Sequence, residues 1–179
     1  MDDYIDTELT LMSEPRSFTI FMDYTEAENV AKNSKLFSCV QDHGGNSYGG
    51  LGWTKYPYGG SDGYFVQGYP GNGEGMLWSG PHNFSGRTKI AIVFEEGIPS
   101  KLYGQSETYS FNNGDVWKCS DSVKANYPFI HQRNLLLGCR EYGSQYENKG
   151  QYWNGTIHTF EVWDYAMSDD EVITKVNGV

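Results

Sequence analysis

The feature that most constrains the fold of this chain is a series of short segments in which apolar and polar residues alternate. In residues 17–24, for example, Phe18, Ile20 and Met22 fall on one face of an extended chain, because successive side chains of a strand point to opposite faces. Such segments recur about every 8 to 14 residues with little convincing helix between them, which is typical of an antiparallel sandwich. The candidate strands are residues 17–24, 36–40, 51–54, 64–67, 88–95, 101–103, 108–111, 134–139 and 156–163. The sequence therefore predicts an all-β fold, because a parallel sheet would need crossover helices.

Two further segments carry weaker expectations. Residues 26–35 are polar and have some helical potential. Residues 42–75 are dense in Gly, Tyr, Asn, Asp and Pro, with several Gly-Gly pairs, and predict only short strands between turns. By contrast, both faces of residues 88–95 are mostly apolar, so this strand is expected in the middle of a sandwich.

The C-terminal end combines a strand with a strongly marked helix. After the strand at residues 156–163, Ser168 and Glu171 have the spacing of a capping box, and Met167 and Val172 that of a hydrophobic staple. Acidic residues fill the first turn, where the helix dipole favours them. We expect a short helix that ends near residue 176, with Gly178 as part of its stop signal.

The same region carries a family resemblance. The segments Asn134-Leu-Leu-Leu-Gly138, Trp153-Asn-Gly-Thr-Ile-His158 and Val162-Trp-Asp-Tyr-Ala-Met-Ser-Asp-Asp-Glu-Val172 resemble the closing half of laminin-G-like domains. These belong to the concanavalin A-like lectin and glucanase superfamily. The resemblance implies a jelly-roll β-sandwich with a short C-terminal helix, of the kind carried by bacteriophage tail or capsid fibres and by bacterial surface proteins. It also makes Asn154-Gly155 a tight turn that enters the last strand.

Size, composition and charge limit the partners. The 179 residues suit one domain, residues 1–179, and they include 14 Tyr, 9 Phe and 5 Trp, which disfavours disorder. A net charge of −10 disfavours nucleic acid and anionic membrane surfaces as partners. The three cysteines, Cys39, Cys119 and Cys139, match no zinc or CxxC pattern and are expected to be reduced.

Two clusters offer the chemistry of carbohydrate recognition, in which flat aromatic rings stack on sugar C–H groups beside polar side chains that bind hydroxyls. The first lies in the Gly-rich segment and the second in the loop before the last strand. The predicted ligand-binding residues are Asp42, His43, Trp53, Tyr56, Tyr58, Asp62, Tyr142, Tyr146, Tyr152 and Trp153. The alternative is that these aromatic residues cover a core that is short of aliphatic side chains.

Metal and catalytic sites find less support. No cofactor is predicted, although calcium remains an alternative, with oxygen ligands from Asp42, Asn46 and Asp62 or from Asp115 and Asp121. A retaining glycosidase needs two carboxylates on one strand face, about 5 to 5.5 Å apart. No Glu-x-Asp phrase of the glucanase kind occurs. The sequence therefore predicts binding without catalysis.

The leading hypothesis is a carbohydrate-binding or adhesion module that recognises a glycan or cell-surface polysaccharide. The resemblance implies a location in a virion, in a tail or capsid fibre, or at a bacterial cell surface. The rival hypothesis is a structural or protein-interaction domain whose aromatic residues meet other virion or surface-protein subunits. A glycoside hydrolase is the third.

Overall fold

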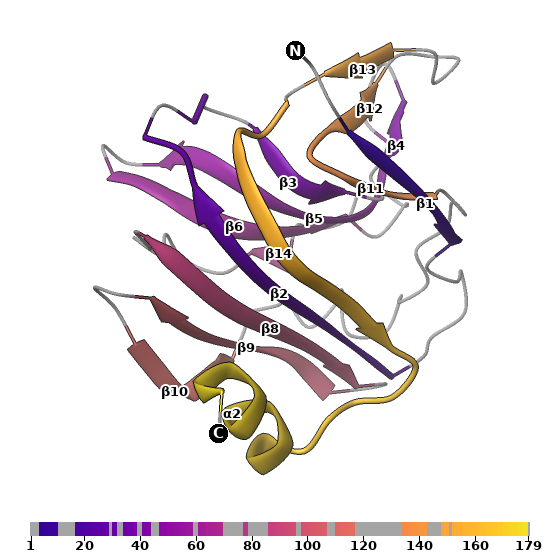
Figure 1. The fold of residues 1–179 in the computed structure, drawn as a ribbon. Coiled ribbons are helices and arrows are strands. Elements are labelled where there is room, and N and C mark those ends of the chain that lie inside the picture. Colours follow the sequence, from indigo (N-terminus) through magenta and orange to yellow (C-terminus); the bar gives the residue numbers. More distant parts are fainter. Residues whose placement is uncertain are drawn as a thin grey trace.

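Two antiparallel β-sheets face each other, and a short helix covers the outer side of one of them (Figure 1). The computed structural model describes residues 4–10, 17–28, 30–31, 34–38, 41–43, 47–58, 61–69, 77–78, 86–95, 98–106, 110–116, 134–142, 148–150 and 152–178. The predicted all-β sandwich with a short C-terminal helix is confirmed. Within the described ranges, no helix is long and apolar enough to cross a membrane.

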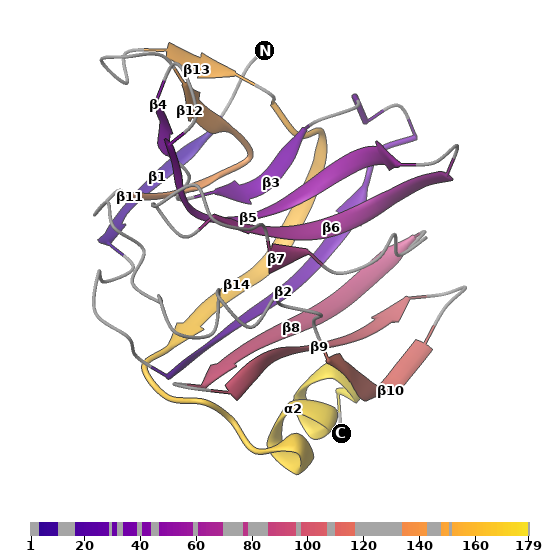
Figure 2. The ribbon, with the colours of Figure 1, turned by 180° about the vertical axis from the view of Figure 1, so that it is seen from behind.

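The larger sheet has seven strands in the order β1-β11-β3-β5-β6-β7, with β4 paired to β5 outside this path. These strands are β1 (Ile5–Thr10), β3 (Lys35–Ser38), β4 (Gln41–His43), β5 (Ser47–Tyr58), β6 (Ser61–Tyr69), β7 (Leu77–Trp78) and β11 (Asn134–Leu137). The view from behind shows β5 and β6 as the long strands of this sheet (Figure 2). A separate hairpin joins β12 (Arg140–Tyr142) to β13 (Asn148–Gly150).

The smaller sheet has five strands in the order β10-β9-β8-β2-β14. They are β2 (Phe18–Glu26), β8 (Arg87–Glu95), β9 (Ile98–Ser106), β10 (Ser110–Val116) and β14 (Gly155–Trp163). The central position expected for residues 88–95 is confirmed, because β8 lies between β9 and β2. Ile90 and Ile92 face the other sheet, while Ala91 and Val93 pack on the opposite side. β14 forms one edge of this sheet.

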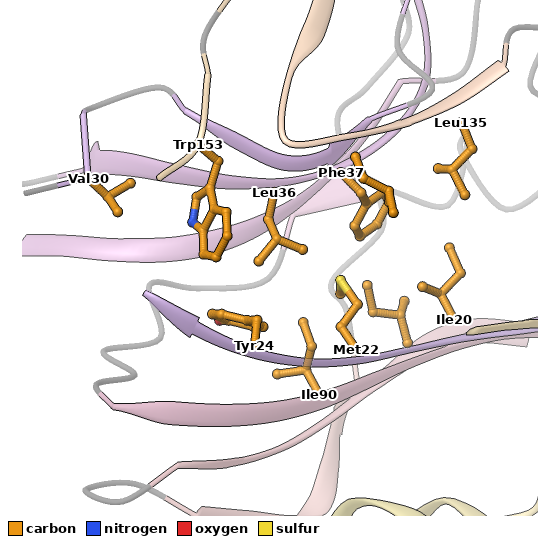
Figure 3. Close-up of a cluster of buried hydrophobic side chains, with 11 residues drawn as sticks. Ile20, Met22, Tyr24, Val30, Leu36, Phe37, Ile90, Leu135 and Trp153 are labelled. Atoms are coloured by element: carbon orange, nitrogen blue, oxygen red, sulfur yellow. The ribbon is translucent and has the colours of Figure 1, made fainter. Parts of the chain in front are cut away.

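The main core lies between the two sheets (Figure 3). The smaller sheet contributes Ile20, Met22, Tyr24, Ile90 and Ile92. The larger sheet contributes Leu36, Phe37, Leu135 and Leu137, and Val30 and Trp153 complete the cluster. Burial of each large apolar side chain contributes about 1.5 to 3 kcal/mol, so this cluster is the main source of cohesion between the sheets.

The last strand departs from simple alternation. Ile157 pairs with Tyr24, but Thr159 already pairs with Asp23, so His158 is an extra residue in β14. Such a bulge reverses the alternation of side chains after it. This explains how Ile157 packs on the same core as Phe160 and Val162.

The helix α2 (Asp169–Asn177) packs on the outer face of the smaller sheet (Figure 1). Both hydrogen bonds of the predicted capping box form between Ser168 and Glu171, and Gly178 ends the helix in a left-handed conformation with a φ of 72°. Met167 and Val172, the two residues of the predicted staple, share the outer cluster with Phe21 and Tyr103. The expected start and end of the helix are therefore confirmed.

Several expectations for the first half of the chain were wrong. The Gly-rich segment forms the longest hairpin of the structure, β5 and β6, where only short strands were expected. The described residues of 26–35 form the end of β2, a turn and the start of β3, without a helix. The sequence also did not indicate β1 or the β12–β13 hairpin. Of the cysteines, Cys139 is buried, whereas Cys39 and Cys119 lie outside the described residues.

Candidate functional site

Parts of the two predicted ligand-binding clusters lie side by side at one corner of the molecule. Asp42 and His43 lie in β4, opposite the start of β5. Tyr142 lies in β12, which contacts both β4 and β3 although about a hundred residues separate them in sequence. β4, β12 and its hairpin partner β13 lie together beside the end of the larger sheet, near the N-terminus (Figure 1). We call this region, formed by β4, β12 and β13, the β4–β12 corner.

The remaining residues of the first cluster lie away from that corner. Tyr58 pairs with Ser61 at the far end of the β5–β6 hairpin, next to Asp62, which pairs with Pro57. A strand rises about 3.3 Å per residue, so Tyr48, opposite Asp42, is up to about 33 Å from Tyr58 along β5. One sugar residue cannot contact both ends. The first predicted cluster is therefore two separate groups.

The middle of the hairpin carries the other two predicted residues. Trp53 pairs with Phe37 on one side and with Val66 on the other, while Tyr56 pairs with Gly63. Tyr56 is two residues from Tyr58 at the hairpin turn, whereas Trp53 is five residues along β5 both from Tyr58 and from Tyr48. The structure therefore does not place either residue beside Asp42 and His43.

The second predicted cluster is also divided. Trp153 is a core residue: its side chain is 7% exposed, and its ring meets that of Tyr24 edge-on at 5.8 Å between centroids. Its backbone N–H donates to the carbonyl of Gly138 at 2.9 Å, which fixes the chain where the indole enters the core. A ring packed in this way has no free face for a sugar, so Trp153 is not a stacking residue. Tyr152 is half-buried and bridges to Lys35, and Tyr146 lies outside the described residues.

The outer face of the smaller sheet carries a charged pair beyond the end of α2. The Arg87 guanidinium donates to both carboxylate oxygens of Asp23, at 2.9 and 2.7 Å. These hydrogen bonds hold the pKa of the buried Asp23 carboxyl below its usual value, against the opposing effect of burial. Close by, Thr25 and His158 are hydrogen-bonded at 2.8 Å. The Arg87–Asp23 ion pair therefore joins β2 to β8 on the outer face of the smaller sheet.

A second charged contact fixes α2 to the sheet. Asp169, the first residue of the helix, accepts hydrogen bonds from Lys101 and from the Tyr103 hydroxyl, both at 2.7 Å. These bonds lower the pKa of Asp169, and burial together with the neighbouring carboxylate raises that of Tyr103. The helix is thus fixed through both its apolar face and its first residue.

Sequence reasoning missed two exposed aromatic residues, Trp163 at the end of β14 and Tyr165 just after it. A signal was present, because Trp163 falls on the opposite face of the strand from Phe160 and Val162. As for metals, no three His, Cys, Asp or Glu residues of the described ranges lie close enough together to hold an ion. Asn46 and Asp121, two of the alternative calcium ligands, lie outside those ranges.

The fold is that of the jelly-roll β-sandwich modules. No known protein family and no curated protein sequence matches the chain. Solved structures do match it. The CBM40 of the Ruminococcus gnavus IT-sialidase has a TM-score of 0.66 and 18% identity, over 90% of this chain and 83% of that one. A mutant of the NanB sialidase from Streptococcus pneumoniae has a TM-score of 0.68 and 15% identity, over 97% of this chain and 26% of that one.

A third similar structure is domain 4 of AbnA, an extracellular arabinanase from Geobacillus stearothermophilus. It has a TM-score of 0.57 and 13% identity, over 93% of this chain and 68% of that one. At such identities the likeness establishes a shared fold. The matched region spans 83% of the CBM40 chain and 68% of the AbnA domain, but only 26% of the NanB chain.

Proposed function

We propose that this chain is a non-catalytic carbohydrate-binding module that recognises a glycan at the β4–β12 corner. The observation that carries the proposal is the contact between β12, the strand of Tyr142, and β4, the strand of Asp42 and His43. A tyrosine, an aspartate and a histidine on contacting strands include the side-chain types that stack on sugars and bind their hydroxyls. Tyr58 and Asp62 lie at the far end of the β5–β6 hairpin, Tyr56 lies on the same strand, and Tyr152 bridges to Lys35. These four residues are proposed as contacts for a longer chain of the same glycan.

The likeness to known modules supports the same proposal. Two matching structures are named as a sialidase CBM40 bound to α2,3- and to α2,6-sialyllactose, and the AbnA domain is named as a complex with arabinotriose. Those ligands are properties of those proteins. For this chain they define the first compounds to test.

The test is calorimetric titration of the wild-type protein with 3′-sialyllactose, 6′-sialyllactose and arabinotriose, and with purified bacterial cell-wall polysaccharides. We expect at least one to bind, and both Asp42→Ala and Tyr142→Ala to weaken that binding at least about tenfold. Asp170→Ala is the control, because Asp170 is exposed on α2, outside the corner. If no compound binds, or if the control loses as much affinity as the corner variants, the proposal is wrong.

We place the module in a bacterial surface protein or in a phage tail or capsid fibre, on the basis of its laminin-G-like C-terminal sequence. Such a module acts by attaching its parent protein to a cell envelope. Fluorescently labelled protein should therefore bind intact bacterial cells of at least one species, and Tyr142→Ala should release it. Retention of the variant on the same cells would argue against glycan attachment through the corner.

A structural or protein-interaction role is the second candidate, and one feature favours it. β1 is an edge strand of the larger sheet, and its residues Ile5 and Leu9 are exposed. Edge strands with apolar side chains are prone to pair with other chains. If this role is correct, sedimentation should show self-association that Ile5→Asp abolishes, and the corner variants should leave that association unchanged.

A further inference from the structure

The end of β14 and one side of α2 form an exposed cluster that lies away from the β4–β12 corner (Figure 1). It consists of Glu161 and Trp163 on β14, Tyr165 in the connection that follows, and Lys175 on the helix. We call these four residues the β14–α2 cluster. Trp163 is 36% exposed and Tyr165 is 41% exposed, which places both among the few large apolar side chains exposed in the described part of the chain.

The Trp163 ring is held in place although it is exposed. Its indole N–H donates to Oε2 of Glu161 at 2.9 Å, and the Lys175 ammonium pairs with the same oxygen at 2.7 Å. The ammonium also lies 5.3 Å from the centroid of the Trp163 ring and 4.7 Å from that of Phe21. Such cation–π contacts and a shared carboxylate fix an indole before any ligand arrives.

The Tyr165 ring lies next to the Trp163 ring and adds a second aromatic surface to the cluster. The rings of Trp163 and Tyr165 lie 6.0 Å apart between centroids and at 77° to one another, so their planes meet almost at a right angle. Oε1 of Glu161 makes no hydrogen bond with the described residues, and its carboxylate is partly exposed. A fixed ring, a second ring across it and an unused carboxylate acceptor are what a sugar ring needs for stacking and for hydroxyl binding.

We propose that the β14–α2 cluster is a second carbohydrate-binding subsite, which takes one pyranose residue of an extended polysaccharide. The pyranose stacks its C–H face on the Trp163 ring, meets the Tyr165 ring with its edge and donates a hydroxyl to Oε1 of Glu161. The inference rests on the proposed function. Two subsites on one rigid module raise the affinity for a long polymer by avidity, while a short oligosaccharide gains nothing from the second.

The competing explanation is that the cluster only attaches α2 to the edge of the sheet. That role accounts for Glu161 and Lys175, because their ion pair joins the strand to the helix. It does not account for Tyr165. The backbone carbonyl of Tyr165 already anchors the connection by accepting from Thr19 Oγ1 at 3.0 Å, while its side chain stays exposed beside Trp163. Tyr165 is therefore the residue that separates the two explanations.

The experiment measures the Trp163 indole resonance and the affinity for a polymer. The indole N–H signal of Trp163 is assigned in ¹⁵N spectra by its absence from Trp163→Phe. It is followed during titration with 3′-sialyllactose, 6′-sialyllactose and arabinotriose, and with a soluble fraction of bacterial cell-wall polysaccharide. We expect at least one of these carbohydrates to shift the signal. Tyr165→Ala should weaken polymer binding about tenfold with little change in the thermal midpoint, whereas Asp170→Ala should change neither.

The outcomes separate the two proposals. If the polymer binds the wild type and Tyr142→Ala weakens it, while the Trp163 signal stays fixed and Tyr165→Ala has no effect, the subsite is refuted and the proposed function stands. If none of the four carbohydrates binds the wild type, the proposed function fails and the subsite fails with it. If Tyr165→Ala lowers the free energy of unfolding by as much as it lowers the free energy of polymer binding, Tyr165 has a structural role instead.

Discussion

Replacement of Gly155 by alanine tests how closely the last strand approaches the core. Gly155 begins β14 and pairs with Glu26. A Cβ atom on Gly155 would lie 2.3 Å from Cη2 and 2.7 Å from Cζ2 of Trp153, and 2.4 Å from the Thr25 carbonyl oxygen. Non-bonded carbon atoms normally stay about 3.5 to 4.0 Å apart. The new methyl group would therefore overlap the indole by more than about 1 Å.

Neither the Trp153 indole nor the Thr25 carbonyl can move aside without a cost in stability. The Thr25 oxygen belongs to the backbone of β2, and the Trp153 indole is packed against Tyr24 in the core. Overpacking of this kind usually costs about 1 to 3 kcal/mol, and we expect Gly155→Ala to fall at the upper end, near 3 kcal/mol. In a domain of this size each kcal/mol corresponds to about 2 to 4 °C, so the thermal midpoint should fall by about 6 to 12 °C.

The assay is urea unfolding followed by circular dichroism, with two comparisons. Gly178→Ala is the control: its Cβ would meet only the flexible end of Lys89, and its left-handed φ of 72° should cost about 1 kcal/mol. The double variant Gly155→Ala/Trp153→Leu removes the clashing ring atoms, so its cost should be smaller than the sum of the single costs by at least about 1 kcal/mol. Additive costs, or a Gly155→Ala variant as stable as the wild type, would refute the reasoning.

Three further outcomes follow from the described contacts. The Asp23 pKa is lowered by its arginine partner, so the stability it contributes is present above the ordinary value of 3.8 and is lost as the pH falls through the lower folded value. The difference in urea midpoint between the wild type and Asp23→Asn should therefore shrink between about pH 6 and about pH 3, and parallel profiles would contradict this. Ser168→Ala removes the helix N-cap and should cost about 1 kcal/mol in the same urea assay, whereas an unchanged midpoint would show that the cap contributes nothing. Because Cys139 is buried, a Cys39→Ser/Cys119→Ser variant should react with a thiol reagent only after denaturant is added, and rapid labelling of the native protein would be inconsistent with this.

The C-terminal third was predictable because its signals are local. A capping box needs only Ser168 and Glu171, and a left-handed stop needs only Gly178, so each can be recognised without knowledge of the rest of the chain. The acidic residues of the first turn of α2 therefore stabilise the helix N-terminus. The extent of the strand before the helix was predicted equally well, because residues 156–163 nearly match β14.

The β5–β6 hairpin was underestimated because its stability is not local. Glycine disfavours strands when a segment is considered alone, but pairing with neighbours on both sides can override that preference. Trp53 pairs with Phe37 on one side and Val66 on the other. These partners come from two different strands, and no periodicity within residues 42–75 reveals them. The same reasoning applies to β1, whose partner β11 lies more than a hundred residues away in the sequence.

The candidate site was the hardest part to predict because an aromatic residue near a strand serves the core or the surface according to the face on which it lies. Trp153 and Trp163 flank the same strand, and the sequence favoured Trp153 as the ligand-binding residue. The structure buries Trp153 against Tyr24 and exposes Trp163, and the extra residue His158 reverses the alternation between them. The sequence shows Trp163 opposite Phe160 and Val162, but a bulge depends on pairing with β2, so its face relative to Ile157 could be assigned only once the register of both strands was known.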